Sequence, residues 1–364
     1  MKITSIISFL LCLNLCMACD EKKSGSGSLY EEWPWAEQQP VPDEPETPDQ
    51  PEDPDTPDQP EDPETPAEDA EWTVVSDAFG DLPEYVVIKK SPSKLQAKSA
   101  IAFIAELDLS KVSFEVWGIN APTLEGSDEP LQTPSQVYEA QGKPSVVINA
   151  GYFYTEGGKS YSSSLEVSNG TLLSPNINYT SQDWKTLYYP TRAAFIEHSD
   201  GTYEVCWTYW SSSSEHYIYD VPAENSYDAK PLAVPSETFP CTARPFEAKN
   251  AIGGSPVLIK GGEIKNTYKE ELIEIGAEGS APRTAIGLTA DKKLVLFVCE
   301  GRNMTDGVPG YTTGEVAQIL LDYGCTDAVN LDGGGSTLML VNGKEVLKPS
   351  DGKQRAVASC VYIK

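Results

Sequence analysis

The chain has 364 residues, 55 of them acidic and 27 basic, and a formal net charge of −28 at pH 7. This acidic excess disfavours a nucleic-acid partner, because binding a polyanion requires a basic patch. The two histidines, His198 and His216, do not lie beside a credible nucleophile. The composition therefore argues against a Ser-His-Asp triad and against a histidine-rich zinc site.

Residues 1–19 have the features of a secretory signal. Lys2 precedes an apolar run that is too short to span a bilayer, and small residues precede Cys19. The sequence LCMAC is similar to a bacterial lipoprotein cleavage box, although Cys16 stands where a small aliphatic residue is commoner. The alternative is an ordinary secreted protein that is cut nearby. We expect a lipid on Cys19 to anchor the protein to the cell envelope, at the outer membrane, on its periplasmic or surface-exposed face.

Residues 20–71 repeat proline with aspartate or glutamate and show no apolar periodicity. This segment holds 19 acids and 2 lysines, so it contributes −17 of the total charge of −28. Such a chain cannot bury enough apolar surface to offset its ordering entropy. We therefore expect a disordered, extended tether that holds a domain away from the membrane.

Residues 72–364 are not divided by any proline- or glycine-rich linker, which favours one large domain. Short runs rich in Val, Ile, Tyr and Phe recur, bounded by Gly, Asn, Asp or Pro, as is typical of strands. The run TLMLVNGKEVL predicts a hairpin with Asn342 and Gly343 in its turn. We assign the α+β class: a single sheet-rich domain, mixed or antiparallel, with a few helices.

Two segments have helical signals. A Thr-Pro cap starts the first, near residues 133–141. In TTGEVAQILLDYG, Thr312 or Thr313 can cap the N-terminus, Glu315 lies in the first turn and Gly324 ends the helix.

The five cysteines beyond the signal are too scattered for a disulfide scaffold, and no CxxC pair suggests zinc. The spacing alone does not decide whether Cys206 and Cys241 form a disulfide.

The run AVNLDGGGSTLML places an acid, Asp332, at the end of an apolar strand. Gly333, Gly334 and Gly335 could turn several N–H groups toward one anion, and Ser336 and Thr337 add hydroxyl donors. The pattern is neither a Walker loop nor a GxGxxG turn. The alternative is a tight bend between two core strands, in which Asp332 caps the turn.

Four other strand ends place polar residues beside glycine. They are INAGYF with Asn149 and Gly151, AIGGSPVLIKGG with Ser255, APRTAIGL with Arg283, and LFVCEGR with Glu300 and Arg302. Arginine suits phosphate, because its planar fork donates paired, charge-assisted hydrogen bonds. Each segment alone also fits a surface arginine or a glycine bulge. Together they predict a shared polar pocket at one edge of the sheets.

In this order, the segments NAGYF, GGSPVLIKGG, PRTAIGL, EGR, the long NLDGGGS block and RAVASCVYI resemble the phosphodiester glycosidase family. The resemblance runs from about Ser145 to the C-terminus. This family includes the mammalian enzyme that removes N-acetylglucosamine from the phosphate of mannose 6-phosphate. The resemblance implies a hydrolase that cleaves sugar-1-phosphate diesters, with a phosphorylated glycan as its substrate.

The resemblance also implies a set of site residues. The catalytic candidates are Asp332, Glu300, Arg283 and Arg302. The substrate-binding candidates are Asn149, Gly151, Arg244, Ser255, Asn330, Gly333, Gly334, Gly335, Ser336 and Thr337, with Arg355 as a further candidate. No metal is required, although Asp, Glu and Asn side chains could hold a structural calcium ion. We expect a monomer.

In the implied reaction, Arg283 and Arg302 hold the phosphoryl oxygens together with the glycine amides. A carboxylate near two arginines should stay ionised, so Asp332 suits a base or nucleophile, and the acid is left open. Phosphodiesters of cell-wall or exopolysaccharide polymers are a further substrate class. The competing reading is a non-catalytic glycan-binding surface lipoprotein, whose Trp207, Tyr209 and Trp210 either stack on sugars or pack within a strand.

Overall fold

The computed structural model describes residues 71–364, apart from 124, 212–214 and 274. The expected signal, Cys19 and the tether as far as residue 70 lie outside the described residues. The described residues fall into two compact units, and residues 181–186 belong to one of them. All other described residues belong to the second unit, which carries every element named below. Within the described part of the chain, no helix is long and apolar enough to cross a membrane.

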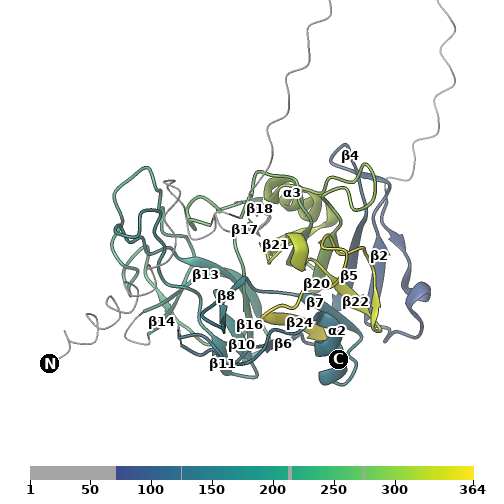
Figure 1. Ribbon diagram of the computed structural model, residues 1–364, viewed down its shortest axis with the longest axis horizontal. Helices are drawn as coiled ribbons and strands as arrows, with labels where there is room; N and C mark the ends of the chain where they lie inside the picture. The colour runs from purple at the N-terminus through teal and green to yellow at the C-terminus, as the bar shows by residue number, and fades with distance from the viewer. Residues whose placement is uncertain (1–70, 124, 212–214, 274) are drawn as a thin grey trace, which may run out of the picture. The chain divides into compact units, whose positions relative to one another are not determined.

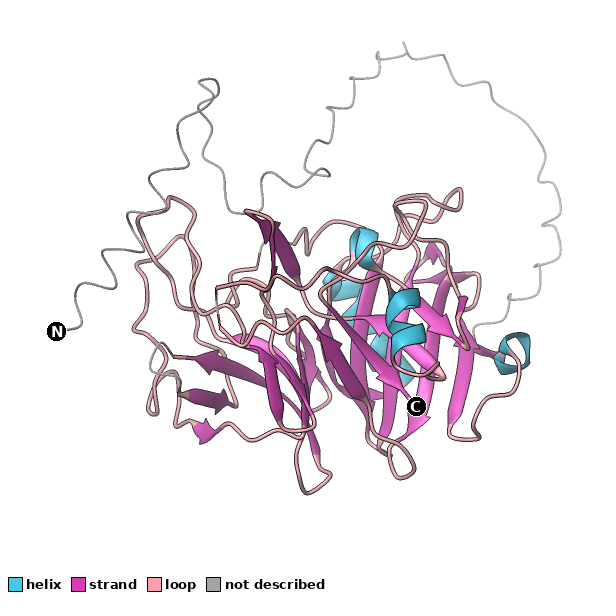
Figure 2. Ribbon diagram, turned by 60° about the horizontal axis from the view of Figure 1, so that its bottom comes forward, coloured by secondary structure: helices cyan, strands magenta, loops and turns pink. Residues whose placement is uncertain are grey.

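Strands dominate this unit (Figure 2), which confirms a sheet-rich α+β fold. They are divided among several sheets, so the strands do not form one continuous sheet. Every strand pair in the described residues is antiparallel, and the mixed pairing that we allowed for is not found there. Antiparallel pairs need only short connections, which agrees with the closely spaced turn signals in the sequence.

The largest sheet has eight strands. Their order is β1 (Thr73–Val74), β2 (Val86–Lys90), β5 (Ala102–Asp108), β20 (Lys293–Cys299), β19 (Arg283–Thr289), β21 (Cys325–Asn330), β17 (Val257–Lys260) and β18 (Glu263–Ile264). The sheet therefore joins strands from both ends of the described chain.

A second sheet has seven strands and a third has five. The order in the second is β11 (Thr171–Ser174), β10 (Glu166–Ser168), β16 (Asn250–Gly253), β12 (Arg192–Glu197), β13 (Tyr203–Trp210), β14 (His216–Tyr219) and β15 (Arg244–Pro245). The order in the third is β23 (Lys344–Glu345), β22 (Met339–Val341), β7 (Val146–Asn149), β24 (Ser359–Ile363) and β6 (Glu115–Gly118). Two hairpins, β3 (Lys94–Leu95) with β4 (Lys98–Ser99) and β8 (Phe153–Glu156) with β9 (Lys159–Ser162), complete the strands.

Both predicted helices are confirmed. Helix α2 spans Pro134–Ala140, and Thr133 caps it. Helix α3 spans Thr313–Tyr323; Thr312 and Glu315 form a capping box at its start, and Gly324 ends it in the left-handed conformation. Two short 3₁₀ turns, η1 (Ser76–Phe79) and η2 (Gly334–Ser336), complete the helical elements of the described residues.

The hydrophobic core lies between the three larger sheets (Figure 1). Phe195 and Trp207 enter it from the seven-stranded sheet, Leu296 from the eight-stranded sheet and Ile148 from the five-stranded sheet. Burial of each such side chain contributes roughly 1.5–3 kcal/mol. A second cluster packs α3 against the eight-stranded sheet, through residues such as Leu320. The core thus fixes the relative positions of the strand ends that carry the candidate site.

The predicted hairpin at Asn342 and Gly343 is confirmed between β22 and β23. Both residues have positive φ, 48° and 77°, as a tight type I′ turn requires.

The open question of a disulfide is answered in the negative. Cys206 and Cys241 are both free thiols, as are the other three cysteines of the described residues. Cys206 lies in the hydrophobic cluster on β13, where it packs as a small apolar side chain.

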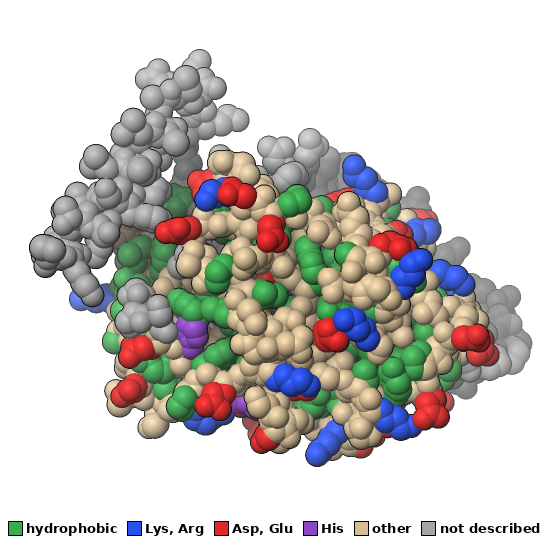
Figure 3. Space-filling model, turned by 90° about the horizontal axis from the view of Figure 1, so that it is seen from below, with side chains coloured by type: hydrophobic (Ala, Val, Ile, Leu, Met, Phe, Trp, Pro, Cys, Tyr) green, Lys and Arg blue, Asp and Glu red, His purple; other side chains and the backbone are tan. Residues whose placement is uncertain are grey.

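On the face shown in Figure 3, acidic and basic side chains are interspersed. This agrees with the sequence arithmetic, which assigns most of the net negative charge to residues 20–71.

Candidate active site

Asp332 lies two residues beyond the end of β21 and is only 6% exposed. Its backbone N–H donates to the carbonyl of Ala150 at 2.8 Å. Its own carbonyl accepts from the Asn149 side-chain amide at 2.6 Å. These two bonds tie the end of β21 to the end of β7. The predicted pairing of the NAGYF and NLDGGGS segments at one place is therefore found in the structure.

The glycine turn holds this carboxyl group and brings two arginines close to it. A Cβ on Gly334, whose φ is +57°, would lie only 2.8 Å from Nη2 of Arg302. A Cβ on Gly335 would collide with Arg355 and Asp351. At Gly334 the positive φ favours glycine, and at both positions a side chain would displace the end of an arginine.

The turn uses several of its amides internally, which differs from our expectation of a row of amides for an anion. The Gly334 N–H donates to the Pro282 carbonyl at 2.8 Å, and the Ser336 N–H donates to the Gly333 carbonyl at 3.0 Å. The Gly333 N–H and the Ser336 side chain hydrogen-bond the Asp332 carboxyl. The turn therefore positions the Asp332 carboxyl group.

Burial raises the pKa of the Asp332 carboxyl from 3.8 to about 6. The Ser336 hydrogen bond, the charge of Arg355, the Gly333 amide and the charge of Arg302 all lower this pKa, but less strongly. We expected the charges of the arginines to decide the pKa of Asp332. Burial outweighs them in the structure, because the carboxyl group is almost wholly removed from water. Asp332 is thus poised to titrate close to neutral pH.

Arg302 and Arg355 form a pair of cations at the mouth of this cluster. Arg355 donates to Ser336 Oγ at 3.4 Å and to Asp351 at 2.7 Å. Partial burial lowers the pKa of Arg302, as does the charge of Arg355, whereas Asp351 and Asp332 raise it. Two guanidinium groups that repel each other gain stability from an anion between them.

Arg283 points inward as predicted, but it bonds main-chain carbonyls. It is 3% exposed. Its Nε donates to Tyr311 at 2.8 Å, and its Nη2 donates to Gly276 and Gly279, each at 2.7 Å. Burial lowers its pKa. These contacts make Arg283 a scaffold for the loop beside the glycine turn.

Asn149, Asn330 and Ser255 form the floor beneath Asp332. The Asn149 side-chain oxygen accepts from Thr284 at 2.8 Å and from the Leu338 N–H at 3.0 Å. The Asn330 amide donates to the Ser255 carbonyl at 2.9 Å, whereas its Oδ1 is buried without a partner in the described residues. The Thr337 hydroxyl is buried and unpartnered in the same way.

Two residues of this floor escaped the sequence prediction. The Tyr152 hydroxyl donates to Ser255 at 2.8 Å and accepts from Asn330 at 2.8 Å. The fully buried Glu271 accepts from Ser255 Oγ at 2.5 Å and from the Val257 N–H at 2.9 Å. Tyr152 is visible in NAGYF as an aromatic after glycine. Glu271 stands in the charged run YKEELIE, which carries no sign of burial.

The remaining candidates lie at the edges of the cluster or outside it. Gly151 donates its N–H to Ser359 Oγ at 2.9 Å. Glu300 follows β20 and accepts from the Lys348 N–H at 2.9 Å. Arg244 lies on β15, where it bonds Glu204 at 2.7 Å and Asp220 at 3.1 Å. The structure therefore does not bring Arg244 to Asp332.

The sequence analysis allowed for a structural calcium ion held by Asp, Glu and Asn side chains. In the described ranges, no three His, Cys, Asp or Glu side chains are grouped so that they could hold a metal ion.

Comparison with known proteins agrees with the motifs. The family model described as phosphodiester glycosidase matches residues 142–364, more than half of the chain. A Homo sapiens N-acetylglucosamine-1-phosphodiester alpha-N-acetylglucosaminidase is 38% identical over 129 residues, 33% of this chain and 24% of that protein. A Bacillus subtilis protein named SPbeta prophage-derived uncharacterized protein YomE is 39% identical over 82 residues, 22% of this chain and 12% of that protein. The chain thus spans a quarter or less of the length of these two relatives.

Solved structures also resemble the chain. A hypothetical protein from Synechocystis is 16% identical with a TM-score of 0.50, covering 80% of this chain and 67% of that one, which shows a shared fold. A zebrafish N-acetylglucosamine-1-phosphodiester alpha-N-acetylglucosaminidase catalytic domain, auto-inhibited by its pro-peptide, is 22% identical with a TM-score of 0.49, covering 80% and 81%. The family match over more than half of the sequence decides the assignment. The chain belongs to the phosphodiester glycosidase family.

Proposed function

We propose that this protein hydrolyses sugar-1-phosphate diesters and releases the sugar from its phosphate. The observation that carries the proposal is a buried Asp332 carboxyl held in a glycine turn beside Arg302 and Arg355. The family match covers all three residues. A phosphodiester carries one negative charge between two polyols, and this arrangement offers two guanidinium groups, one of them paired with Asp351, beside the titratable Asp332 carboxyl group.

The two arginines take the phosphoryl oxygens. Charge-assisted bonds from planar guanidinium groups fit phosphate geometry, and they gain strength as charge grows on the departing phosphate. A phosphate monoester has a second pKa near 6, so it departs at neutral pH without needing a strong acid. This removes the need for a second catalytic carboxyl group.

Asp332 acts as the general base in this scheme. It takes a proton from water, the water oxygen bonds to C1 of the sugar, and the bond between C1 and the phosphate oxygen breaks with its electron pair on phosphate. The products are a free sugar and a phosphate monoester. When the pKa of a base lies near the working pH, much of the base is ionised and its affinity for the proton is still high.

The substrate class follows from the relatives' names and remains part of the proposal. The human relative is named for an N-acetylglucosamine-1-phosphodiester. An N-acetylglucosamine-phospho-sugar is therefore the first substrate to try. Cell-wall and exopolysaccharide phosphodiesters present the same bond on another polymer. We also propose that the protein acts as a monomer.

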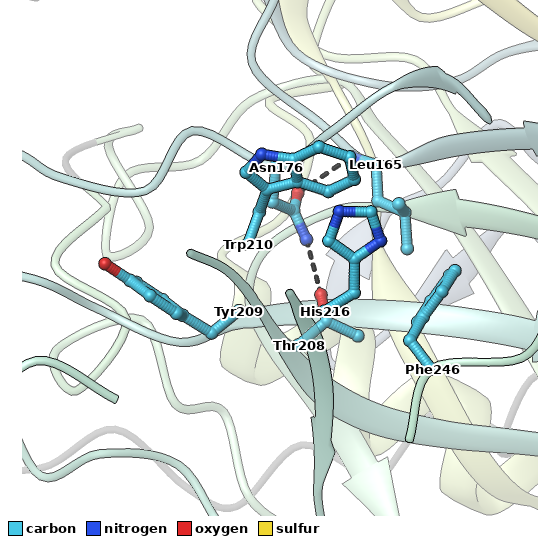
Figure 4. A pocket seen from close by; sticks show the side chains of 7 residues that line it. All are labelled: Leu165, Asn176, Thr208, Tyr209, Trp210, His216 and Phe246. Carbon is cyan, nitrogen blue, oxygen red and sulfur yellow. Dashed lines mark hydrogen bonds between the residues drawn. The ribbon is translucent and has the colours of Figure 1, made fainter. Parts of the chain in front are cut away.

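The competing glycan-binding role loses its main support. Trp207 and Tyr209 are 2% and 3% exposed, so they cannot stack on a sugar. Trp210 packs against His216 at the cavity shown in Figure 4. That cavity has a volume of about 10 Å³, room for roughly one water molecule. These aromatics belong to strand packing.

The test is turnover of N-acetylglucosamine-phospho-mannose, with product analysis in oxygen-18 water. We expect the label in the free sugar, and a fall in kcat/KM of at least 100-fold for Asp332→Asn and of at least tenfold for Arg302→Ala and Arg355→Ala. Arg244→Ala is the matched control, because its guanidinium lies at another sheet edge. Wild-type rates for Asp332→Asn, or label in the phosphate, would contradict the scheme.

A further inference from the structure

A groove with a volume of about 600 Å³ opens beside the arginine pair. This size falls within the range of about 300–1,000 Å³ that is typical of small-molecule sites. Its lining residues are Glu300, Met304, Glu345, Val346, Leu347, Lys348, Pro349 and Gly352. Except for Glu300, none of them is among the residues that the sequence motifs single out.

Glu300 lines this groove and carries one buried carboxyl oxygen that has no hydrogen-bond partner in the described residues. The residue is 3% exposed, and its Oε1 accepts from the Lys348 N–H at 2.9 Å. Its Oε2 is buried without a hydrogen-bond partner in the described residues. A buried acceptor without a donor has lost its hydrogen bonds to water and gained none in return. A hydroxyl group of a ligand in the groove would supply that donor.

Ser350 and Asp351 link the arginine pair to the groove. Arg302 donates to Ser350 Oγ at 3.4 Å, and Arg355 bonds Asp351. Ser350 and Asp351 stand between Pro349 and Gly352, which line the groove. Contacts therefore run in order from Asp332 through the arginines to the groove. A sugar-1-phosphate diester has the same order: the reacting C1, the phosphate and the second polyol.

The lining also matches a polyol better than a second anion. Glu300 and Glu345 contribute carboxyl groups, whereas the single cation, Lys348, bonds Thr305 Oγ1 at 3.2 Å. Met304, Val346, Leu347 and Pro349 add apolar surface. Sugar rings combine hydroxyl donors at their edges with apolar C–H faces, so both kinds of lining have a partner.

We propose that this groove binds the second sugar of the diester, the one that keeps the phosphate, and that Glu300 accepts a hydrogen bond from one of its hydroxyl groups. The inference rests on the proposed function. It also assigns Glu300 to substrate binding, whereas the motif alone suggested a catalytic role.

Two probe substrates separate this role from catalysis. One is N-acetylglucosamine 1-(methyl phosphate), which lacks the second sugar. The other is N-acetylglucosamine-phospho-mannose, which has it. For Glu300→Gln we expect kcat/KM on the mannose diester to fall at least tenfold more than kcat/KM on the methyl diester, mainly through KM. Met304→Trp fills the groove without touching Glu300 and should show the same selectivity.

Glu106→Gln is the control, because Glu106 lies on β5 and bonds Lys89 and Tyr323 away from the groove. We expect equal, near-native rates from it on both substrates. Mannose 6-phosphate should bind the native protein in calorimetry, and bind at least tenfold more weakly to Glu300→Gln. Equal losses on both diesters, or no loss, would overturn the groove assignment while leaving the hydrolase assignment in place. No turnover of either diester by the native protein would overturn the proposed function itself.

Discussion

Two opposing effects act on the pKa of the Asp332 carboxyl group. Burial favours the neutral acid, while Arg355, Arg302 and the hydrogen bonds of the glycine turn favour the carboxylate. Burial prevails, and the resulting pKa is about 6. The two arginines therefore lower the pKa of Asp332, and in the proposed reaction they also bind the phosphate.

The pH profile of kcat/KM should report this balance. If ionised Asp332 is the base, activity rises with pH through an acid limb near 6. Because the charge of Arg355 lowers the pKa of Asp332, Arg355→Gln should move this limb to higher pH. Arg244→Gln should leave it in place. A limb that stays fixed in Arg355→Gln would show that another group is titrating.

The same carboxyl should make the fold less stable at neutral pH. Its pKa is raised on folding, so the folded chain holds the proton more tightly, and the charged form destabilises the fold above about pH 6. A shift of about two pKa units corresponds to 2–3 kcal/mol. Asp332→Asn should therefore raise the free energy of unfolding at pH 7.5 by on the order of 2 kcal/mol. Denaturant titrations should show this gain disappearing near pH 4.

Among the structural elements, short sequence signals correctly predicted those that are formed by residues close together in the chain. The Thr312 capping box and the Asn342–Gly343 turn are formed by neighbours in sequence, and both were predicted correctly. The run AIGGSPVLIKGG did not predict where its strands would pair, because its two halves, β16 and β17, lie in different sheets. The pairing of β5 with β20 joins residues nearly 200 positions apart, which no local pattern records.

Two substitutions at the start of helix α3 should change the free energy of unfolding in opposite directions. Thr312→Ala removes the acceptor for the Glu315 N–H and should lower the free energy of unfolding by about 1 kcal/mol. Gly314→Ala should raise it by up to about 1 kcal/mol, because the new Cβ meets nothing closer than 3.4 Å. Thermal unfolding followed by circular dichroism measures both. A loss in the Gly314 variant would mean that the helix start is constrained by more than its own backbone.

Across the whole molecule, the sequence located the site better than it assigned the roles. Asp332 and Asn149 meet as the motifs suggested, since both follow core strands. Arg283 was expected to bind the phosphate and Arg244 to contact the substrate, and each bonds other protein groups. Which arginine is committed elsewhere depends on long-range packing. For the same reason Glu271, in a segment that looks exposed, could not be found in advance.

The proposed membrane attachment belongs to the full chain. We propose from the sequence alone that Cys19 carries the lipid. Cys19→Ala should move the protein from the membrane fraction to the soluble fraction, and the native chain should incorporate a labelled fatty acid. Diesterase activity per molecule should be the same in both forms. Retention of the variant on membranes would point to another attachment.

The eight-stranded sheet limits where this protein can be shortened. The family match starts at residue 142, yet β20 is paired with β5 at Ala102–Asp108 and β24 with β6 at Glu115–Gly118. A chain beginning at residue 142 would leave the apolar run Leu294–Cys299 as an open sheet edge. Such an edge recruits other chains, so this fragment should aggregate during expression, although it contains every residue of the candidate site. The catalytic segment thus depends for its solubility on strands that contribute nothing to the chemistry.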